Sequence, residues 1–223
     1  MATAPPEAER IAYARRVPDE PSGPPAPSAG RPPAGRQRRV DLRSTPATRV
    51  RPAAPDDVPA LAELAALTFP LACPPSIGPA DAAAFIASRL SREAFDTHLA
   101  EPSHRVLVAT GDDDDVLIGY TLLILGEPAD ADAAAAVTIR PTVELSKCYV
   151  HPVHHGTGTA AALMGASLAA ARGLGAGSVW LGVNQHNSRA QRFYAKSGFT
   201  AAGTKHFAVG TVREDDYVMT RAL

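Results

Sequence analysis

The sequence predicts an α/β fold, because a strand, a helix and a second strand follow one another in its C-terminal half. Residues 143–150 form a strand-like run that ends just before Pro152, and the alanine-rich residues 157–172 are expected to form a helix. Gly173 can stop this helix. Residues 178–184 are a short apolar run bounded by turn residues, which is typical of a buried strand. The three elements therefore indicate a βαβ unit.

Segments upstream of this unit add further elements. Residues 48–51 are expected to form a first strand, and residues 55–64 a capped helix. Residues 104–110 and 116–125 are two apolar runs on either side of a short polar turn, so we expect them to pair as a hairpin. The sheet should therefore contain strands from before the βαβ unit.

Downstream elements complete the expected order. A short helix should follow Asn187, because Asn187 or Ser188 can accept a hydrogen bond as the N-cap and Gly198 can end the helix. Residues 200–207 and 214–223 are candidate strands that would pair as a second hairpin. Strands thus occur on both sides of every predicted helix of the C-terminal half.

The first 46 residues differ in composition from the rest, since they hold ten of the 21 prolines, many alanines and no long apolar stretch. Such a segment cannot offset the entropy of ordering by burial, so we predict a disordered extension over residues 1–46 and one domain over residues 47–223. The extension carries a cluster of arginines, namely Arg31, Arg36, Arg38 and Arg39. A weak electrostatic docking arm and a solvated tail are both compatible with this cluster.

The turn before the alanine-rich helix has the features of an anion-binding site. Gly156 and Gly158 lie directly before the first helical residues. The free N–H groups at a helix N-terminus lie at the positive end of the helix dipole, and glycine lets a phosphate approach them closely. The spacing differs from the glycine patterns of dinucleotide-binding folds and of nucleotide triphosphatases. We therefore expect a different kind of phosphate loop.

Two stretches resemble signatures of one family, the GCN5-related N-acetyltransferases (GNAT). The run His155-Gly156-Thr157-Gly158-Thr159-Ala160 resembles the pyrophosphate loop of this family, with His155 where the family has Gln or Arg. Further along, the second signature of the family is matched in order by Asn187, Ala190, Phe193, Tyr194, Gly198 and Phe199. The resemblance covers residues 48–223.

This resemblance implies a GNAT fold, in which a mixed central sheet of about six to seven strands is flanked by about four helices, with a β-bulge or splay at the acetyl-CoA site. It also implies acetyl-CoA as cosubstrate. The residues that would bind it are Cys148, Tyr149 and Val150 along the pantetheine arm, Asn187 by a hydrogen bond to that arm, and His155, Gly156, Thr157, Gly158, Thr159 and Ala160 around the pyrophosphate. Capping of the following helix is the competing role for Asn187.

The reaction implied by the resemblance is direct transfer of the acetyl group to a primary amine. An amine with a pKa near 10.4 needs about 4.6 kcal/mol to lose its proton at pH 7, so a nearby carboxylate would help. Glu144 is the candidate base, because alternation along the strand places it on one face with Cys148 and Val150. A structural carboxylate is the alternative. Tyr194 stands at the family's position for the acid that protonates the leaving thiolate, and packing of its ring in the core is the alternative.

The identity of the acceptor is open at this point. The resemblance places the acceptor cleft between residues 69–99 and 209–215. Acidic residues that could attract a cationic amine are Glu93, Asp96, Glu214, Asp215 and Asp216. We expect a polyamine-like or other small cationic amine, with a protein amine or an antibiotic amine as alternatives. The competing classes are a non-catalytic acyl-CoA-binding module and an unrelated nucleotide-binding α/β protein.

Composition argues against several other classes of protein. The net charge of −1 argues against a general nucleic-acid binder. No stretch is long and apolar enough for a membrane span or a signal peptide, so we expect a cytoplasmic protein with no membrane partner. No metal is expected, because the loop histidines and the cysteines lack ligand spacing: His151, His154, His155, Cys73 and Cys148. A homodimer through exposed edge strands is compatible with the sequence.

Overall fold

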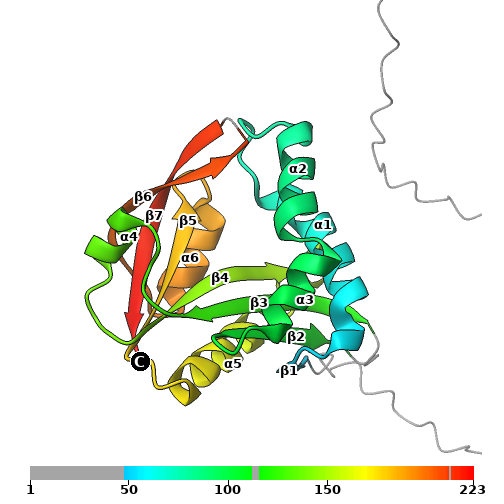
Figure 1. Ribbon diagram of the computed structural model, residues 1–223, viewed down its shortest axis with the longest axis horizontal. Helices are drawn as coiled ribbons and strands as arrows, with labels where there is room; N and C mark the ends of the chain where they lie inside the picture. Colours follow the sequence, from blue (N-terminus) through cyan, green and yellow to red (C-terminus); the bar gives the residue numbers. More distant parts are fainter. Residues whose placement is uncertain (1–47, 112–115, 211) are drawn as a thin grey trace, which may run out of the picture. The chain divides into compact units, whose positions relative to one another are not determined.

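The computed structural model describes residues 48–111, 116–210 and 212–223. The extension predicted over residues 1–46 lies outside the described residues, so its disorder stays a prediction. The described part forms a seven-stranded sheet in the order β1-β2-β3-β4-β5-β7-β6, with helices packed on both faces (Figure 1). The predicted α/β fold class is therefore confirmed.

The strands follow the expected hairpin, crossover and hairpin order. They are β1 (Arg49–Pro52), β2 (His104–Thr110), β3 (Leu117–Leu125), β4 (Thr142–Val150), β5 (Ser178–Asn184), β6 (Thr200–Val209) and β7 (Val212–Ala222). Neighbouring strands are antiparallel except for β4 and β5, which are parallel. The parallel pair is the predicted βαβ unit.

The described residues contain six α-helices, which is more than the approximate number predicted. They are α1 (Val58–Ala72), α2 (Pro79–Arg89), α3 (Arg92–Ala100), α4 (Ala131–Ala136), α5 (Thr159–Gly173) and α6 (Ser188–Lys196), with short 3-10 helices η1 (Pro55–Asp57) and η2 (Pro152–His154). The unpredicted helix α4 is short and nearly all alanine. Its start is fixed by Asp130, whose side chain accepts a hydrogen bond of 2.9 Å from the Ala133 N–H.

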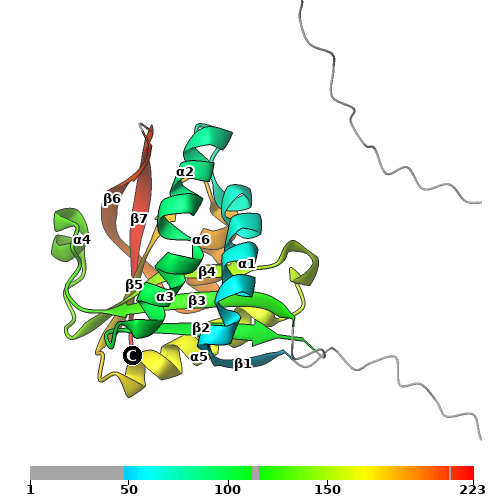
Figure 2. The same ribbon diagram turned by 45° about the vertical axis from the view of Figure 1, so that its right-hand side comes forward.

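Two apolar layers hold the helices on the sheet. Helices α1 to α3 lie over one face and α5 lies on the other (Figure 2). The first layer packs around the fully buried Phe95, Tyr120 and Leu122. The second layer packs α5 against β3, β4 and β5 around Leu168 and Leu181. The central strands β2, β3 and β5 are thus mostly buried on both sides.

Strand β4 carries a bulge and then separates from β5. Leu122 of β3 pairs with Lys147 and Leu123 pairs with Leu145, so Ser146 is the extra residue on β4. The parallel pairing of β4 with β5 covers only Thr142–Glu144, opposite Ser178–Trp180. The bulge and splay that the resemblance implied are therefore present, and they leave the ends of β4 and β5 apart.

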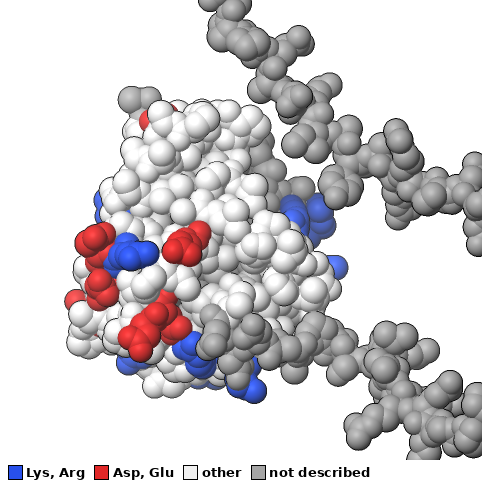
Figure 3. Space-filling view, turned by 90° about the vertical axis from the view of Figure 1, so that its right-hand side faces the viewer, with Lys and Arg blue, Asp and Glu red and all other residues white. Residues whose placement is uncertain are grey.

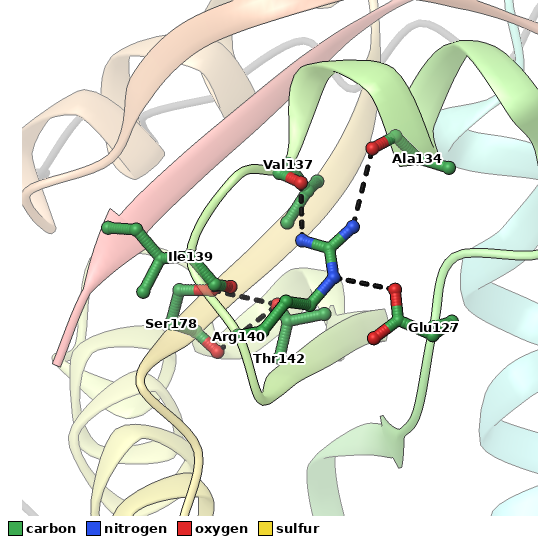
Figure 4. Close-up of polar contacts among 7 residues, drawn as sticks. All are labelled: Glu127, Ala134, Val137, Ile139, Arg140, Thr142 and Ser178. Carbon is green, nitrogen blue, oxygen red and sulfur yellow. Dashed lines mark hydrogen bonds and ion pairs between the residues drawn. The ribbon is translucent and has the colours of Figure 1, made fainter.

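The paired ends of β4 and β5 are fixed by a polar cluster (Figure 4). The guanidinium of Arg140 donates to Glu127 (2.6 Å), to the Ala134 carbonyl (3.3 Å) and to the Val137 carbonyl. Beside it, the Ser178 hydroxyl lies 2.9 Å from the Thr142 hydroxyl. Ser178 also donates to the Ile139 carbonyl (2.7 Å), which ties the segment after α4 to β5, so the splay opens from one anchored end.

None of the helices in the described ranges combines the length and the apolar character needed to cross a membrane.

Candidate active site

The predicted phosphate loop connects β4 to α5 through η2. Gly156 and Gly158 have φ angles of +83° and +95°, in the left-handed region that side chains disfavour. A Cβ atom added at either glycine would have no neighbour within 4 Å, so the backbone is open to an approaching ligand. Gly158 is the N-cap of α5, and the first N–H groups of this fifteen-residue helix lie next to it. The loop therefore has the geometry of an anion cradle.

Two threonines of the loop have structural roles. The Thr157 hydroxyl donates a hydrogen bond of 2.8 Å to the His154 carbonyl and lies 3.0 Å from the Thr159 hydroxyl. Thr159 is only 1% exposed, and its hydroxyl also lies 3.2 Å from that of Thr48. Both were predicted to touch the cosubstrate. Their side chains instead brace the turn, and the Thr157 N–H donates to the His154 carbonyl (3.4 Å), which leaves the Thr159 N–H as the possible contact.

His155 is bound to the end of β4. Its Nε2 atom lies 3.0 Å from the Val150 carbonyl oxygen. Because a carbonyl only accepts hydrogen bonds, Nε2 carries the proton of this bond. The ring therefore closes the loop onto β4, and its contact with a phosphate stays a prediction.

A first cavity of about 420 Å³ runs from this loop to α6. The predicted cosubstrate residues along it are Cys148, Tyr149, Val150, His155, Gly156, Gly158, Ala160 and Asn187, and the predicted acid Tyr194 also lines it. Two distant sequence signatures thus meet in one cavity. Helix α1 supplies the opposite wall through Thr68, Leu71 and Ala72.

Asn187 and Tyr194 reach this cavity from α6. The Asn187 Oδ1 atom accepts a hydrogen bond of 3.0 Å from the Ala190 N–H, so the capping role is present. Its amide nitrogen has no hydrogen-bond partner in the described part of the chain, which leaves this group for a ligand. Burial raises the pKa of Tyr194, so the phenol stays protonated and able to donate at neutral pH.

A second cavity of about 220 Å³ adjoins the first. The two cavities share the lining residues Ala72, Cys148, Tyr149, Asn187, Ala190 and Tyr194. The second cavity continues between the splayed ends of β4 and β5, with α1, α2, β6 and β7 as further walls. A molecule in the first cavity can therefore meet another in the second at Tyr194.

The position of Glu144 corrects the strand-face argument made from the sequence. The bulge at Ser146 reverses the alternation, so Cys148 and Val150 lie on the α5 side, where Leu145 also packs. Glu144 lies on the opposite face and lines neither cavity. The charge of Glu144 acts on Lys147, although burial is the larger effect and lowers the pKa of that lysine.

Of the five acidic residues expected to attract an amine, some lie at the second cavity and the others are exposed away from it. Asp216 lines the second cavity, and Glu214 is bound to a side chain at its edge. Asp215 is exposed, and its Oδ1 atom lies 2.8 Å from the Nδ1 atom of His206. Glu93 and Asp96 are exposed on α3 and line neither cavity. Acidic side chains gather with basic ones toward one edge of the helical side, while much of that side is uncharged (Figure 3).

Burial raises the pKa of Asp216 to about 6. The charge of Lys205 opposes this rise, and the carboxylates of Glu214 and Asp215 add to it. The sequence did not single out Asp216, because three acidic residues follow one another and only alternation distinguishes them. That alternation, which buries Val218 and Asp216 and exposes Asp215, was the available signal.

The fold matches that of a known family of acetyltransferases. A family model described as Acetyltransferase (GNAT) family matches residues 64–199. An uncharacterized N-acetyltransferase of Mycobacterium tuberculosis is 48% identical over 167 residues, covering 75% of this chain and 98% of the relative. The chain belongs to the GNAT family of acetyltransferases, as the two signatures predicted.

Solved structures share the fold at low sequence identity. The PaiA N-acetyltransferase of Thermoplasma acidophilum, in complex with coenzyme A, matches with a TM-score of 0.63 and 19% identity, covering 79% of this chain and 99% of that chain. NAA60 of Arabidopsis thaliana, in complex with a bisubstrate analogue, matches with a TM-score of 0.61 and 18% identity over the same shares. These similarities describe the architecture and leave the acceptor open.

Proposed function

We propose that this protein transfers the acetyl group of acetyl-CoA directly to a primary amine of a small molecule. The observation that carries the proposal is the junction of the two cavities at Tyr194. The glycine loop and the N-terminus of α5 suit the pyrophosphate, and the first cavity leads from there to Tyr194. The thioester would then face the second cavity, where the amine would enter.

The strand β4 supports the proposed position of the cosubstrate. Beyond the splay its residues Cys148 to Val150 have no β5 neighbour, so their edge is free of β5 and can pair with the pantetheine amides as an added strand would. Asn187 offers its amide nitrogen from the other side. The edge of β4 and the Asn187 amide before α6 would thus hold the pantetheine arm in one orientation, which favours attack by an amine.

Tyr194 is the proposed acid. When the tetrahedral intermediate collapses, the C–S bond breaks and its electron pair leaves on sulfur. The protonated phenol can donate to this thiolate. Glu144 is the candidate base from the sequence, and a route from this residue to the amine would need an intervening water, since Glu144 lines neither cavity.

Ligand-dependent melting followed by a thiol-release assay tests the proposed function. Acetyl-CoA or coenzyme A at 100 times its dissociation constant should add about 2.7 kcal/mol of stability, while ATP and NAD should add none. Thiol release should then depend on an added small primary amine. Stabilisation with no turnover on any small amine would instead favour a protein amine or a non-catalytic acyl-CoA-binding module. A chain stabilised by ATP or NAD alone would contradict the proposed cosubstrate.

A further inference from the structure

The second cavity contains a buried carboxylate oxygen without a partner. Asp216 on β7 is 6% exposed, and its Oδ1 atom has no hydrogen-bond partner among the described residues. An ionised carboxylate in this state is costly unless a cation or a donor meets it. Because Asp216 lines the cavity, a bound molecule can supply the missing partner.

The neighbouring lysine does not fill this role. Lys205 lies opposite Asp216 in the pairing of β6 with β7, yet no ion pair joins them within 4 Å in the described part of the chain. The Lys205 ammonium instead lies 5.7 Å from the centre of the Phe207 ring. Both side chains pass over Gly182, where an added Cβ would lie 2.8 Å from Lys205 Cε and 3.1 Å from Asp216 Oδ2. The glycine leaves room for the carboxylate to face the cavity.

We propose that Asp216 binds the ammonium group of the acceptor and takes its proton, and that the acceptor is a monoamine with an apolar body. This inference rests on the proposed function and replaces Glu144 as the base. It follows from the cavity, which joins a single unpartnered carboxylate to a wall of aromatic rings.

The aromatic wall comes from three separate elements. The rings of Phe69 and Phe85 are stacked with their centres 4.5 Å apart, and Phe207 meets Phe85 edge-on at 5.9 Å. All three line the second cavity together with Ile77. Such a wall suits an apolar or aromatic substituent on the amine.

The charges around the cavity disfavour a polyamine. Lys147 lines the cavity, with its ammonium 3.1 Å from the Ser146 hydroxyl, and Lys205 lies beside Asp216. A second cationic group on the acceptor would meet these two ammonium groups. One carboxylate thus balances one ammonium group of the substrate.

The proton and electron movements balance with these residues. The ammonium group loses one proton to Asp216, and the freed lone pair attacks the acetyl carbon to form the C–N bond. The C–S bond breaks, the thiolate takes the proton of Tyr194, and the tyrosinate takes the second proton from the nitrogen. Asp216 then releases its proton to solvent. The products are the amide, coenzyme A and one proton.

Amine binding by Asp216→Asn tests the inference independently of turnover. The probe is 2-phenylethylamine, added to the full chain with coenzyme A, and its dissociation constant is followed by thermal shift. Loss of a charge-assisted hydrogen bond should weaken binding about 10- to 100-fold in this variant. Asp215→Asn is the matched control, because the adjacent carboxylate is exposed and paired with His206 (2.8 Å). Equal binding by the wild type and Asp216→Asn would overturn the inference.

Thiol-release kinetics separate this inference from the proposed function. In the wild type, 2-phenylethylamine should give a higher kcat/KM than spermidine, and Asp216→Asn should raise the amine KM and lower kcat while leaving the acetyl-CoA KM within about threefold. An active wild type whose kinetics Asp216→Asn does not change would refute the role of Asp216 alone. A preference for spermidine would refute the monoamine class. Amine binding that depends on Asp216, without any thiol release, would refute the transferase and leave the binding site.

Discussion

The two cavities differ in how the chain builds them. Two contiguous segments, residues 148–160 and 187–194, supply most of the first cavity, and its proposed anion site is made of backbone groups. The second cavity, the proposed acceptor site, draws side chains from α1, α2, β4, β5, α6, β6 and β7. Backbone sites tolerate change in distant parts of the fold, whereas a site assembled from many elements depends on how each is placed. The first cavity is therefore suited to a constant ligand and the second to a ligand specific to this chain.

Tyr194→Phe should have the largest effect, because Tyr194 lines both cavities. Loss of the acid should lower kcat about 100-fold or more, while the KM for acetyl-CoA stays within about threefold. Steady-state thiol release measures both quantities. Tyr217→Phe is the matched control, since Tyr217 lines neither cavity and should keep wild-type rates. An unchanged kcat in Tyr194→Phe would mean that the thiolate leaves without this acid.

Gly158→Val should weaken the binding of acetyl-CoA selectively. Its φ of +95° is strained for a β-branched residue by about 1–3 kcal/mol, and relief of this strain would turn the N–H groups of α5 away from the ligand. We expect the acetyl-CoA KM to rise about 10- to 100-fold with little change in amine binding.

Gly165→Ala is the control for this change. Gly165 lies inside α5, and a Cβ there has no neighbour within 4 Å. Alanine should stabilise the helix by about 0.5–1 kcal/mol and leave the acetyl-CoA KM unchanged. If both variants bind acetyl-CoA as the wild type does, the glycine loop is not the anion site.

The sequence predicted what is local and missed what the tertiary structure imposes. The helix α5, the strand β5 and the helix α6 begin and end within about two residues of the predicted positions, because glycines and an asparagine cap mark their ends. The sequence argument placed Glu144 on the same face of β4 as Cys148, which is wrong because a bulge inserts one residue between them. No side chain near Ser146 signals this bulge. The short helix α4 is held by the Asp130 cap and by the bonds of Arg140, and its six residues are too few to show the apolar periodicity that predicts a helix.

The second cavity was the hardest part to predict. Asp216 becomes a buried carboxylate only when β7 is paired with β6 on one side and with β5 on the other. The aromatic wall likewise joins Phe207 to Phe69 and Phe85, which lie far from it in the sequence. Local patterns report which residues can be buried and not which distant residues they will meet.

Asp216 should also make the free energy of unfolding of the protein depend on pH. Its folded pKa of about 6 exceeds the unfolded value near 3.8, so the folded state binds more protons between these values. The free energy of unfolding should therefore fall by up to about 3 kcal/mol as pH rises from 4 to 7. The titratable groups that surround Asp216 are Cys73, Lys147, Cys148, Tyr149, Tyr194, Lys205, Glu214 and Asp215.

Thermal melting of Asp216→Asn across this pH range checks the expected slope. The variant should lack the fall in stability and melt about 2–6 °C above the wild type at pH 8, since an ionised buried carboxylate has been removed. Asp215→Asn should keep most of the wild-type slope, because burial is the largest cause of the raised pKa of Asp216 and the exposed Asp215 carboxylate only adds to it. A variant less stable than the wild type at pH 8 would show that Asp216 supports the fold through an attraction that outweighs its burial.

Substitution of His98, which lies outside both cavities, should have the smallest effect, and that effect should be on stability. Burial lowers its pKa to about 4, with added repulsion from His104, whose Nδ1 lies 3.1 Å from that of His98, and from Lys147 of β4. The unfolded state, with a pKa near 6.5, then binds more protons between pH 4 and 6.5, so stability from this residue is lost as pH falls through that window. Partial exposure to solvent limits the effect to about 1 kcal/mol.

Urea unfolding of His98→Gln at pH 5 and 7.5 measures this effect. The free energy of unfolding should differ less between the two pH values in this variant than in the wild type, and the exposed His186→Gln is the control. Binding of the amine and of acetyl-CoA should be unchanged. A change in either binding constant would mean that α3 couples to the cavities, and the contrast between a local cosubstrate site and an assembled acceptor site would then extend to a third region.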